Sequence, residues 1–190
     1  ETGGSIFYTK VYDAERPELF FKANKNRISG TGQPVRIRRD SNWNVPEPEL
    51  TLFATSNAKI VGYSIGNDMS SRDIEGQNPL YLPQAKTYDG CASLGPCIYV
   101  TEKPLVKGLK IELRVERNGS IVFCESISTE RMKRKHQELV DYLFKESSFP
   151  NGAFLMTGTG IVPPPDFTLK LGDIIQIEIE KIGTLINTVA

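Results

Sequence analysis

The sequence predicts a mainly β domain of the α+β class with one main helix. Residues 109–116 alternate between apolar and charged side chains, which is the pattern of a strand with one buried face. Asn118-Gly119 follows as a two-residue hairpin turn into a partner strand. Residues 173–180 alternate in the same way, with isoleucines facing inward. The main helix is expected at 134–146, where apolar residues recur at helical spacing: Leu139, Val140, Leu143 and Phe144.

Shorter elements are expected in the first half of the chain. Strands are predicted at residues 17–22, 34–39, 47–54 and 58–65, separated by segments rich in turn-forming residues. Residues 70–93 contain many Gly, Pro, Asn and Gln residues, which predicts a loop with a short helical turn near residues 70–75. A loop of this length inside a compact domain usually has a functional role.

The composition excludes several classes of partner. The 190 residues are enough for one domain with a core, and the 23 basic and 23 acidic residues leave no net field that would attract nucleic acid. No apolar run approaches the length of a membrane span. The three cysteines lack metal-binding or disulfide spacing, so we expect reduced, buried thiols in a cytoplasmic protein: Cys91, Cys97 and Cys124.

Charged residues gather between residues 46 and 97. Glu47 and Glu49 lie two apart in a predicted strand, so both carboxylates leave the same face. Asp68 and Arg72 follow the next apolar segment, and Lys86 comes after a loop. Together these side chains could form one polar site, because two or three carboxylates with water suit a hard divalent cation such as Mg²⁺.

Other interpretations of these residues remain open at this stage. The two glutamates could line the solvent face of a half-exposed strand, and Gly66-Asn67-Asp68 could be an ordinary turn. Trp43, the only tryptophan, could be a packing anchor or a platform for a substrate. The only histidine, His136, is expected to be a structural or surface residue of the predicted helix.

Seven sequence patterns occur in an order that resembles the fumarylacetoacetate hydrolase (FAH) family. They begin with Glu-x-Glu-Leu and Gly-Tyr-x-x-x-Asn-Asp-x-Ser-x-Arg-Asp, and they end with Lys-x-Gly-Asp and Gly-Thr-Leu-x-Asn. The resemblance covers about residues 17 to 189. The patterns lie at residues 47–50, 62–73, 86–89, 94–96, 157–159, 170–173 and 183–187.

The resemblance implies an FAH-like fold, in which mixed β-sheets roll into a sandwich or barrel with one main helix. It implies a catalytic domain at residues 17–190, with residues 1–16 as the remnant of an N-terminal segment or lid. Members of the family commonly form homodimers or higher homo-oligomers, so self-association is expected here too.

The resemblance also implies roles for the charged residues. Glu47, Glu49 and Asp68 would coordinate Mg²⁺, with Mn²⁺ or Ca²⁺ as other candidates. The substrate would be a small 2-oxo acid that chelates the metal through two oxygens. Arg72 would bind its carboxylate, and Lys86 would neutralise developing negative charge or move a proton.

Three further residues are expected near the substrate. Thr159 would donate a hydroxyl hydrogen bond. Glu75 stands where the family commonly has a substrate-contacting Gln, and this departure leaves its contact in doubt. Glu18 stands where the family usually has an apolar residue, so it lies either on a solvent edge or in the site, where it would be a catalytic base.

The reaction is expected to be a dehydration. Hydrolytic members use a His–Glu pair to activate water, whereas residues 8–15 here carry a tyrosine in place of that histidine. The patterns are most similar to the dehydratases that convert 2-keto-3-deoxy-D-arabinonate to 2,5-dioxopentanoate. Such a lyase would remove a C3 proton with Lys86 or Glu18 and pass through a metal-stabilised enolate. Alternatives are an acylpyruvate hydrolase, a 2-oxo acid decarboxylase, or a binding domain without enzymatic activity.

Overall fold

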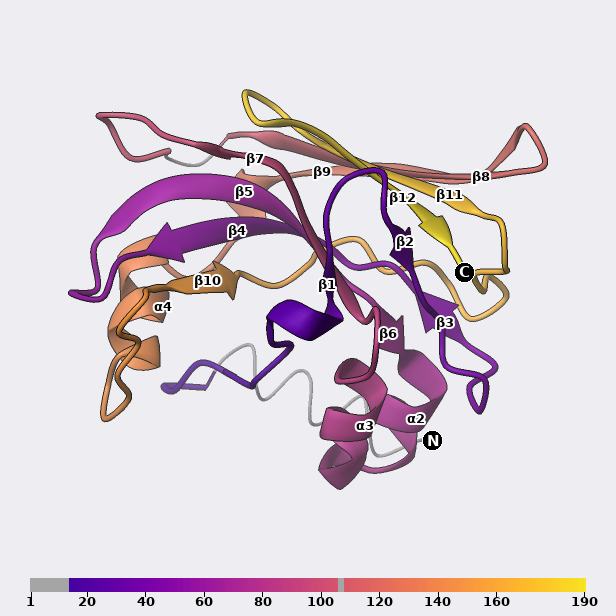
Figure 1. Ribbon diagram of the computed structural model, residues 1–190, viewed down its shortest axis with the longest axis horizontal. Coiled ribbons are helices and arrows are strands. Elements are labelled where there is room, and N and C mark those ends of the chain that lie inside the picture. Colours follow the sequence, from indigo (N-terminus) through magenta and orange to yellow (C-terminus); the bar gives the residue numbers. More distant parts are fainter. Residues whose placement is uncertain (1–13, 106–107) are drawn as a thin grey trace.

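Two five-stranded sheets form the body of the protein in the computed structural model, which describes residues 14–105 and 108–190 (Figure 1). The first sheet has the order β1 (Ile28–Ser29), β7 (Ala92–Tyr99), β5 (Ile60–Asp68), β4 (Pro48–Ala54), β10 (Ala153–Met156). The second has the order β2 (Pro34–Val35), β12 (Gly183–Val189), β11 (Ile174–Ile179), β8 (Lys110–Arg117), β9 (Ser120–Ser128). A small ladder joins β3 (Asn44–Val45) to β6 (Ser70–Ser71).

The sheets are mixed, as predicted. β1 pairs with β7 and β2 with β12 in parallel, and the other pairs within the described residues are antiparallel. One hydrophobic core lies between the two sheets, because apolar side chains of both contribute to a single buried cluster. Members from the two sheets include Leu50, Leu52 and Ile65 on one side and Leu113, Ile177 and Leu185 on the other.

The helices lie at two ends of the sheets (Figure 1). α2 (Arg72–Gln77) and α3 (Leu82–Lys86) follow β6, and α4 (His136–Leu143) lies below β4 and β10 in this view. α4 confirms the predicted main helix but is shorter than 134–146, because Lys135 is extended and Glu146 has φ of 63°. Short 3₁₀ turns occupy the linking segments η1 (Lys25–Arg27), η2 (Pro79–Tyr81) and η3 (Thr129–Arg131).

The predictions for β4, β5, β8 and β11 are confirmed within a few residues, as is the Asn118-Gly119 hairpin. The predicted strand at residues 17–22 is wrong, and the one at 34–39 shrinks to Pro34–Val35. The first segment is extended, but carbonyl oxygens at its end accept from side chains instead of a neighbouring strand. Thr87 Oγ1 donates to Phe21 O at 3.2 Å, and Cys91 Sγ donates to Lys22 O at 3.7 Å.

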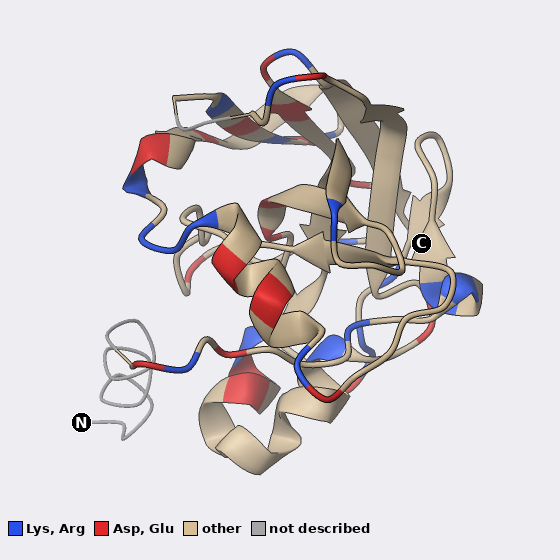
Figure 2. Cartoon of the chain, turned by 90° about the vertical axis from the view of Figure 1, so that its left-hand side faces the viewer, with Lys and Arg blue, Asp and Glu red and all other residues tan. Residues whose placement is uncertain are grey.

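Basic and acidic residues are mixed along the sheets, helices and loops of the chain (Figure 2). Within residues 14–105 and 108–190, no helix is both long and apolar enough to cross a membrane. The three cysteines are free thiols, as expected. Only Cys91 is buried, however, while Cys97 and Cys124 lie on exposed strand positions, so the expectation of three buried thiols is wrong.

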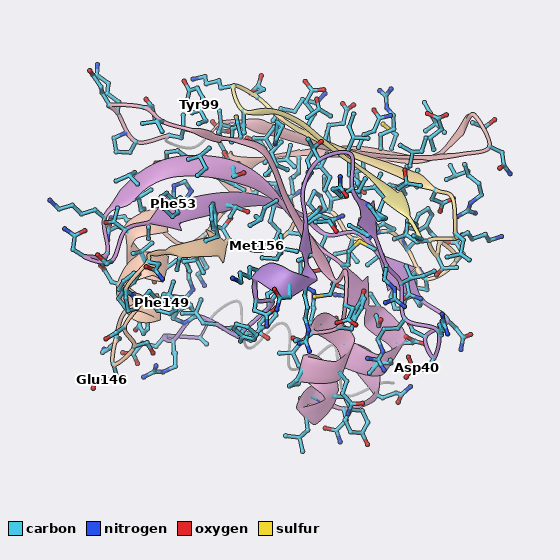
Figure 3. The ribbon with its side chains drawn as sticks, viewed as in Figure 1. Asp40, Phe53, Tyr99, Glu146, Phe149 and Met156 are labelled. Atoms are coloured by element: carbon cyan, nitrogen blue, oxygen red, sulfur yellow. The ribbon has the colours of Figure 1, made fainter. Side chains whose placement is uncertain are left out.

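A two-bond ion pair between the partly exposed Arg117 and the buried Asp173 joins β8 to the start of β11. Asp173 is fully buried and accepts from Arg117 Nε and Nη2 at 2.7 Å each. We expect Asp173→Ala to lower the free energy of unfolding by about 2–4 kcal/mol, because the buried carboxylate accepts from Arg117 and also from the backbone N–H of Lys170, at 2.8 Å. Asp40 forms the same two-bond ion pair with Arg38 but is exposed at a loop (Figure 3), so Asp40→Ala is the matched control. Equal losses in denaturant titrations of the two variants would contradict this expectation.

Candidate active site

Three carboxylates meet where the antiparallel strands β4 and β5 carry them. Glu49 pairs with Gly66 across the ladder, and the N–H of Asp68 donates to the carbonyl of Glu47 at 3.0 Å. One oxygen from each of Glu47, Glu49 and Asp68 lies within 4.8 Å of the others, and all three residues are buried. The alternative in which the glutamates line a solvent face is therefore wrong.

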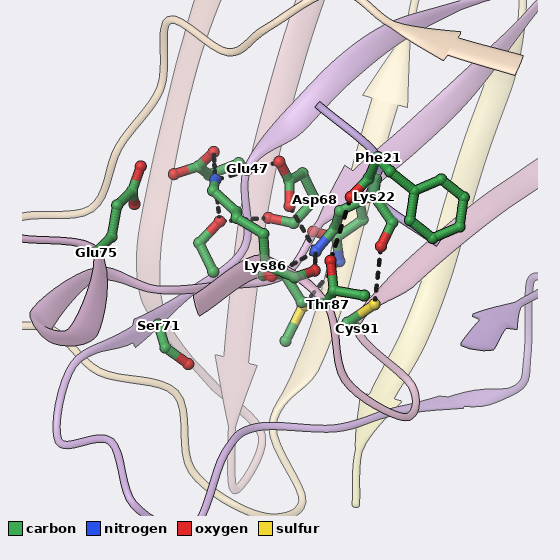
Figure 4. Close-up of polar contacts among 12 residues, drawn as sticks. Phe21, Lys22, Glu47, Asp68, Ser71, Glu75, Lys86, Thr87 and Cys91 are labelled. Carbon is green, nitrogen blue, oxygen red and sulfur yellow. Dashed lines mark hydrogen bonds and ion pairs between the residues drawn. The ribbon is translucent and has the colours of Figure 1, made fainter. Parts of the chain in front are cut away.

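Lys86, the last residue of α3, inserts its ammonium group into this cluster (Figure 4). Nζ donates to Glu47 Oε2 at 2.7 Å, to Asp68 Oδ2 at 3.1 Å and to Ser70 Oγ at 2.5 Å. Burial alone would lower the pKa of Lys86, but the charges of Glu47 and Asp68 outweigh burial and raise this pKa above its ordinary value. In the metal-free cluster the proton is therefore held on Lys86, which favours a charge-stabilising role over that of a base.

A second lysine, which the sequence analysis did not identify, contacts the same cluster. Lys22 Nζ lies 2.7 Å from Asp68 Oδ1 and donates to the carbonyl oxygens of Met69, at 2.9 Å, and Lys86. This ammonium fastens the end of the extended 17–22 segment to the site. The sequence offered only a lysine after two phenylalanines, which predicts nothing about a partner forty-six residues away.

Burial and the neighbouring carboxylates act together on Glu49. Its Oε2 accepts from the N–H of Gly158 at 2.5 Å. Burial, followed by the charges of Asp68 and Glu47, raises the pKa of Glu49 to about 8. With this raised pKa, Glu49 binds a proton at neutral pH unless a divalent metal ion takes its place. The three buried carboxylates supply the hard oxygen ligands that such an ion prefers. The residues therefore fit a divalent cation such as Mg²⁺.

Arg72 and Glu75 lie at the edge of the cluster, on consecutive turns of α2. Arg72 Nη1 is 3.2 Å from Glu47 Oε1 and 3.5 Å from Glu75 Oε2. The guanidinium also lies over the ring of Trp43, 5.6 Å from its centroid. Glu75, which stands where the family commonly has Gln, is buried.

Glu18 and Thr159 approach the cluster less directly. Glu18 is solvent-exposed, but partial burial and the charges of Glu75 and Glu47 raise its pKa, against an opposing effect of Lys86. Glu18 is therefore an exposed acid within electrostatic range of the cluster. The hydroxyl of Thr159 donates to the carbonyl of Ile161 at 3.1 Å. From this loop it is the backbone N–H of the neighbouring Gly158 that contacts the cluster, at Glu49.

His136 lies away from the acids, at the other end of β5. Its ring centroid is 6.2 Å from that of Tyr63, beside a cavity of about 200 Å³ that Ile60 and Gln137 also line. Its expected structural role agrees with this position. Most of residues 8–15, where the sequence lacks the hydrolytic histidine, lie outside the described residues.

Comparisons with known proteins agree with this geometry. A 2-dehydro-3-deoxy-D-arabinonate dehydratase of Saccharolobus solfataricus is 48% identical over 98% of this chain and 63% of its own length. A probable 2-keto-3-deoxyxylonate dehydratase of Haloferax volcanii is 46% identical over 96% of this chain and 63% of its own length. This chain thus spans less than two thirds of these curated relatives.

A solved structure and a family model extend the comparison. The structure of a 2-keto-3-deoxy-D-arabinonate dehydratase complexed with magnesium and 2,5-dioxopentanoate superposes with a TM-score of 0.92 at 48% identity. It is matched over 96% of this chain and 65% of that one. The model of the fumarylacetoacetate (FAA) hydrolase C-terminal domain matches residues 8–190. The chain therefore belongs to the fumarylacetoacetate hydrolase family.

Proposed function

We propose that this protein is a divalent-metal-dependent dehydratase that converts 2-keto-3-deoxy-D-arabinonate to 2,5-dioxopentanoate, with Mg²⁺ as its cofactor. The observation that carries the proposal is the buried cluster of Glu47, Glu49 and Asp68 beside a protonated Lys86. Similarity to the two dehydratases, one of them solved with magnesium and 2,5-dioxopentanoate, supports the choice of reaction. The lack of a histidine near the cluster in the described chain favours dehydration over hydrolysis.

The proposed roles follow from charge and position. Bound Mg²⁺ would withdraw charge from a chelated 2-oxo acid and so acidify its C3 protons. Arg72 would hold the substrate carboxylate, for which its forked donor is suited. Glu75 and Thr159 would line the rest of the substrate site. The ammonium of Lys86 would stabilise the negative charge that develops when the C3 proton leaves.

Glu18 is the proposed base, because Lys86 already carries a proton and Glu18 is an exposed acid within electrostatic range of the cluster. Its carboxylate would take a C3 proton and return it to the departing C4 hydroxyl, which leaves as water. The C3–C4 double bond that remains then migrates. C5 and its hydroxyl oxygen each lose one hydrogen, C3 and C4 each gain one, and C5 becomes the aldehyde carbon. The product, 2,5-dioxopentanoate, therefore differs from the substrate by one water.

A product assay tests the reaction. With Mg²⁺ present, we expect 2,5-dioxopentanoate to form from 2-keto-3-deoxy-D-arabinonate and to disappear when EDTA is added. An acylpyruvate is the parallel substrate for the hydrolase alternative, and release of carbon dioxide marks the decarboxylase alternative. Cleavage of the acylpyruvate without dehydration of the sugar acid would overturn the proposal. If neither stability nor ligand binding depends on divalent ions, the result would favour the binding-domain alternative.

We also propose that copies of the protein self-associate. Two large apolar side chains, Phe20 and Phe21, remain exposed beside a cavity of about 410 Å³ that α3 helps to line. Exposed apolar patches of this kind often mark protein interfaces. Light scattering after gel filtration measures the mass directly, and a monomer would contradict this proposal.

Two assignments remain proposals on sequence grounds. The three free thiols favour a cytoplasmic location. The proposed catalytic domain is residues 17–190, which follows residues 1–16 as a separate first segment. Arg134 donates to the carbonyl oxygens of Ala14, at 2.5 Å, and Glu15, at 3.3 Å, which joins the described end of that first segment to the region of α4.

A further inference from the structure

Trp43 lies beneath the guanidinium group of Arg72. The small antiparallel ladder of β3 and β6 pairs Asn44 with Ser71. Trp43, just before Asn44, and Arg72, just after Ser71, therefore also face each other. The backbone N–H of Arg72 donates to the carbonyl of Trp43 at 2.8 Å. The side chains then meet with the guanidinium carbon 5.6 Å from the ring centroid, within the range of a cation–π contact.

The loop that carries Trp43 is fixed from its other side by Asp73. Ser41 Oγ donates to Asp73 Oδ1 at 2.5 Å, and the backbone N–H of Asn42 donates to Asp73 Oδ2 at 2.7 Å. Asp73 follows Arg72 directly in α2. The backbone positions that carry the aromatic ring and the guanidinium are therefore held together by one short unit of the fold.

The ring contacts its surroundings through its face. The indole Nε1 is buried and has no hydrogen-bond partner among the described residues. A buried tryptophan that is kept for its polar edge normally has such a partner. Arg72 also pairs with the carboxylates of Glu47 and Glu75. The face of the ring therefore competes with these carboxylates for the guanidinium.

We propose that Trp43 is a positioning residue, which holds the guanidinium of Arg72 in the orientation that receives the carboxylate of a 2-oxo acid. This inference rests on the proposed function only for the class of ligand. It assigns no chemical step to Trp43, and it predicts an effect on carboxylate binding that passes through Arg72.

The test measures binding of 2-oxopentanoate, which has the 2-oxo acid group but no hydroxyl to eliminate. Calorimetry with Mg²⁺ present compares wild type, Trp43→Leu, Trp43→Phe, Arg72→Met and the double variant Trp43→Leu/Arg72→Met. We expect Trp43→Leu to weaken binding about 3- to 20-fold and Trp43→Phe to restore most of it, since a cation–π contact is of that strength. In the Arg72→Met background, Trp43→Leu should have no further effect.

A matched control is available on α4. Tyr142 also lies under cations, with Arg16 at 5.7 Å and Lys145 at 5.3 Å from its ring, but outside the acidic cluster. Tyr142→Leu should leave binding unchanged. The methyl ester of 2-oxopentanoate, which lacks the carboxylate charge, should bind wild type and Trp43→Leu equally.

Wild-type fluorescence provides a second measurement that needs no change at residue 43. Trp43 is the only tryptophan, so its emission should shift when 2-oxopentanoate binds, and it should not shift in Arg72→Met. Additive losses in the double variant, equal losses for acid and ester, or an emission shift that persists without Arg72 would each overturn the inference. Binding of the acid without any dehydration of the sugar acid would instead overturn the proposed function and leave this inference intact.

Discussion

Glu18→Gln is expected to reduce kcat for dehydration about 10²- to 10⁴-fold while Mg²⁺ and substrate still bind, because the amide cannot accept the C3 proton. Partial burial and neighbouring acids raise the pKa of Glu18 above its ordinary value of 4.5. The base must be ionised, so wild-type kcat/KM should rise with pH through that raised pKa. Steady-state kinetics between pH 4 and 8 measure both effects.

Glu15→Gln is the matched control for this change. Glu15 lies three residues earlier on the same exposed segment, where its carbonyl oxygen accepts from Arg134. Its replacement should leave kcat and the pH profile unchanged. Unaltered turnover in Glu18→Gln would remove Glu18 from the mechanism and return the search for a base to other residues.

Removal of the metal is expected to destabilise the protein most strongly at alkaline pH. Glu49 has a pKa of about 8 in the metal-free cluster against an ordinary value of 4.5, so between these values the folded state holds more protons than the unfolded state. The stability of the metal-free protein should therefore fall as pH rises from about 4.5 to 8, by on the order of 3 kcal/mol. Mg²⁺ should restore it and should bind more tightly as pH rises. Thermal melts with EDTA or Mg²⁺ at pH 6 and 9 test the sign.

Glu49→Gln separates the charge of this residue from its shape. The amide resembles the protonated acid, so the pH dependence of the metal-free protein should weaken, and Mg²⁺ affinity should fall at least about 100-fold. Calorimetric titration with Mg²⁺ measures that loss. A metal-free protein whose stability rises between pH 5 and 8 would contradict the predicted link between the ionisation of Glu49 and stability.

The parts of the fold that the sequence predicts correctly are those with a strong local pattern. Alternation identified β8 and β11, and Asn118-Gly119 located the turn before β9, because side-chain direction in a strand follows directly from residue order. The three carboxylates were predictable for the same reason. Glu47 and Glu49 share a face, and Asp68 ends the next strand.

The errors arise where a distant partner decides the structure. Residues 17–22 have the composition of a strand, but the side chains of Thr87 and Cys91, which follow α3, take carbonyl hydrogen bonds that a strand would need. Lys22 contacts Asp68, and Trp43 packs on Arg72, across separations that carry no periodic pattern. Such contacts depend on how the sheets and loops pack, which local propensity does not encode.

Strand β4 carries core residues on one face and a residue of the acidic cluster on the other, and this arrangement constrains how the protein can diverge. Leu50 and Leu52 lie in the hydrophobic core, while Glu49 on the opposite face belongs to the acidic cluster. Insertion or deletion of one residue would exchange the two faces along the rest of the strand. Descendants of this sequence can therefore change loop lengths and rim residues, and with them the substrate, far more freely than they can change the length of β4.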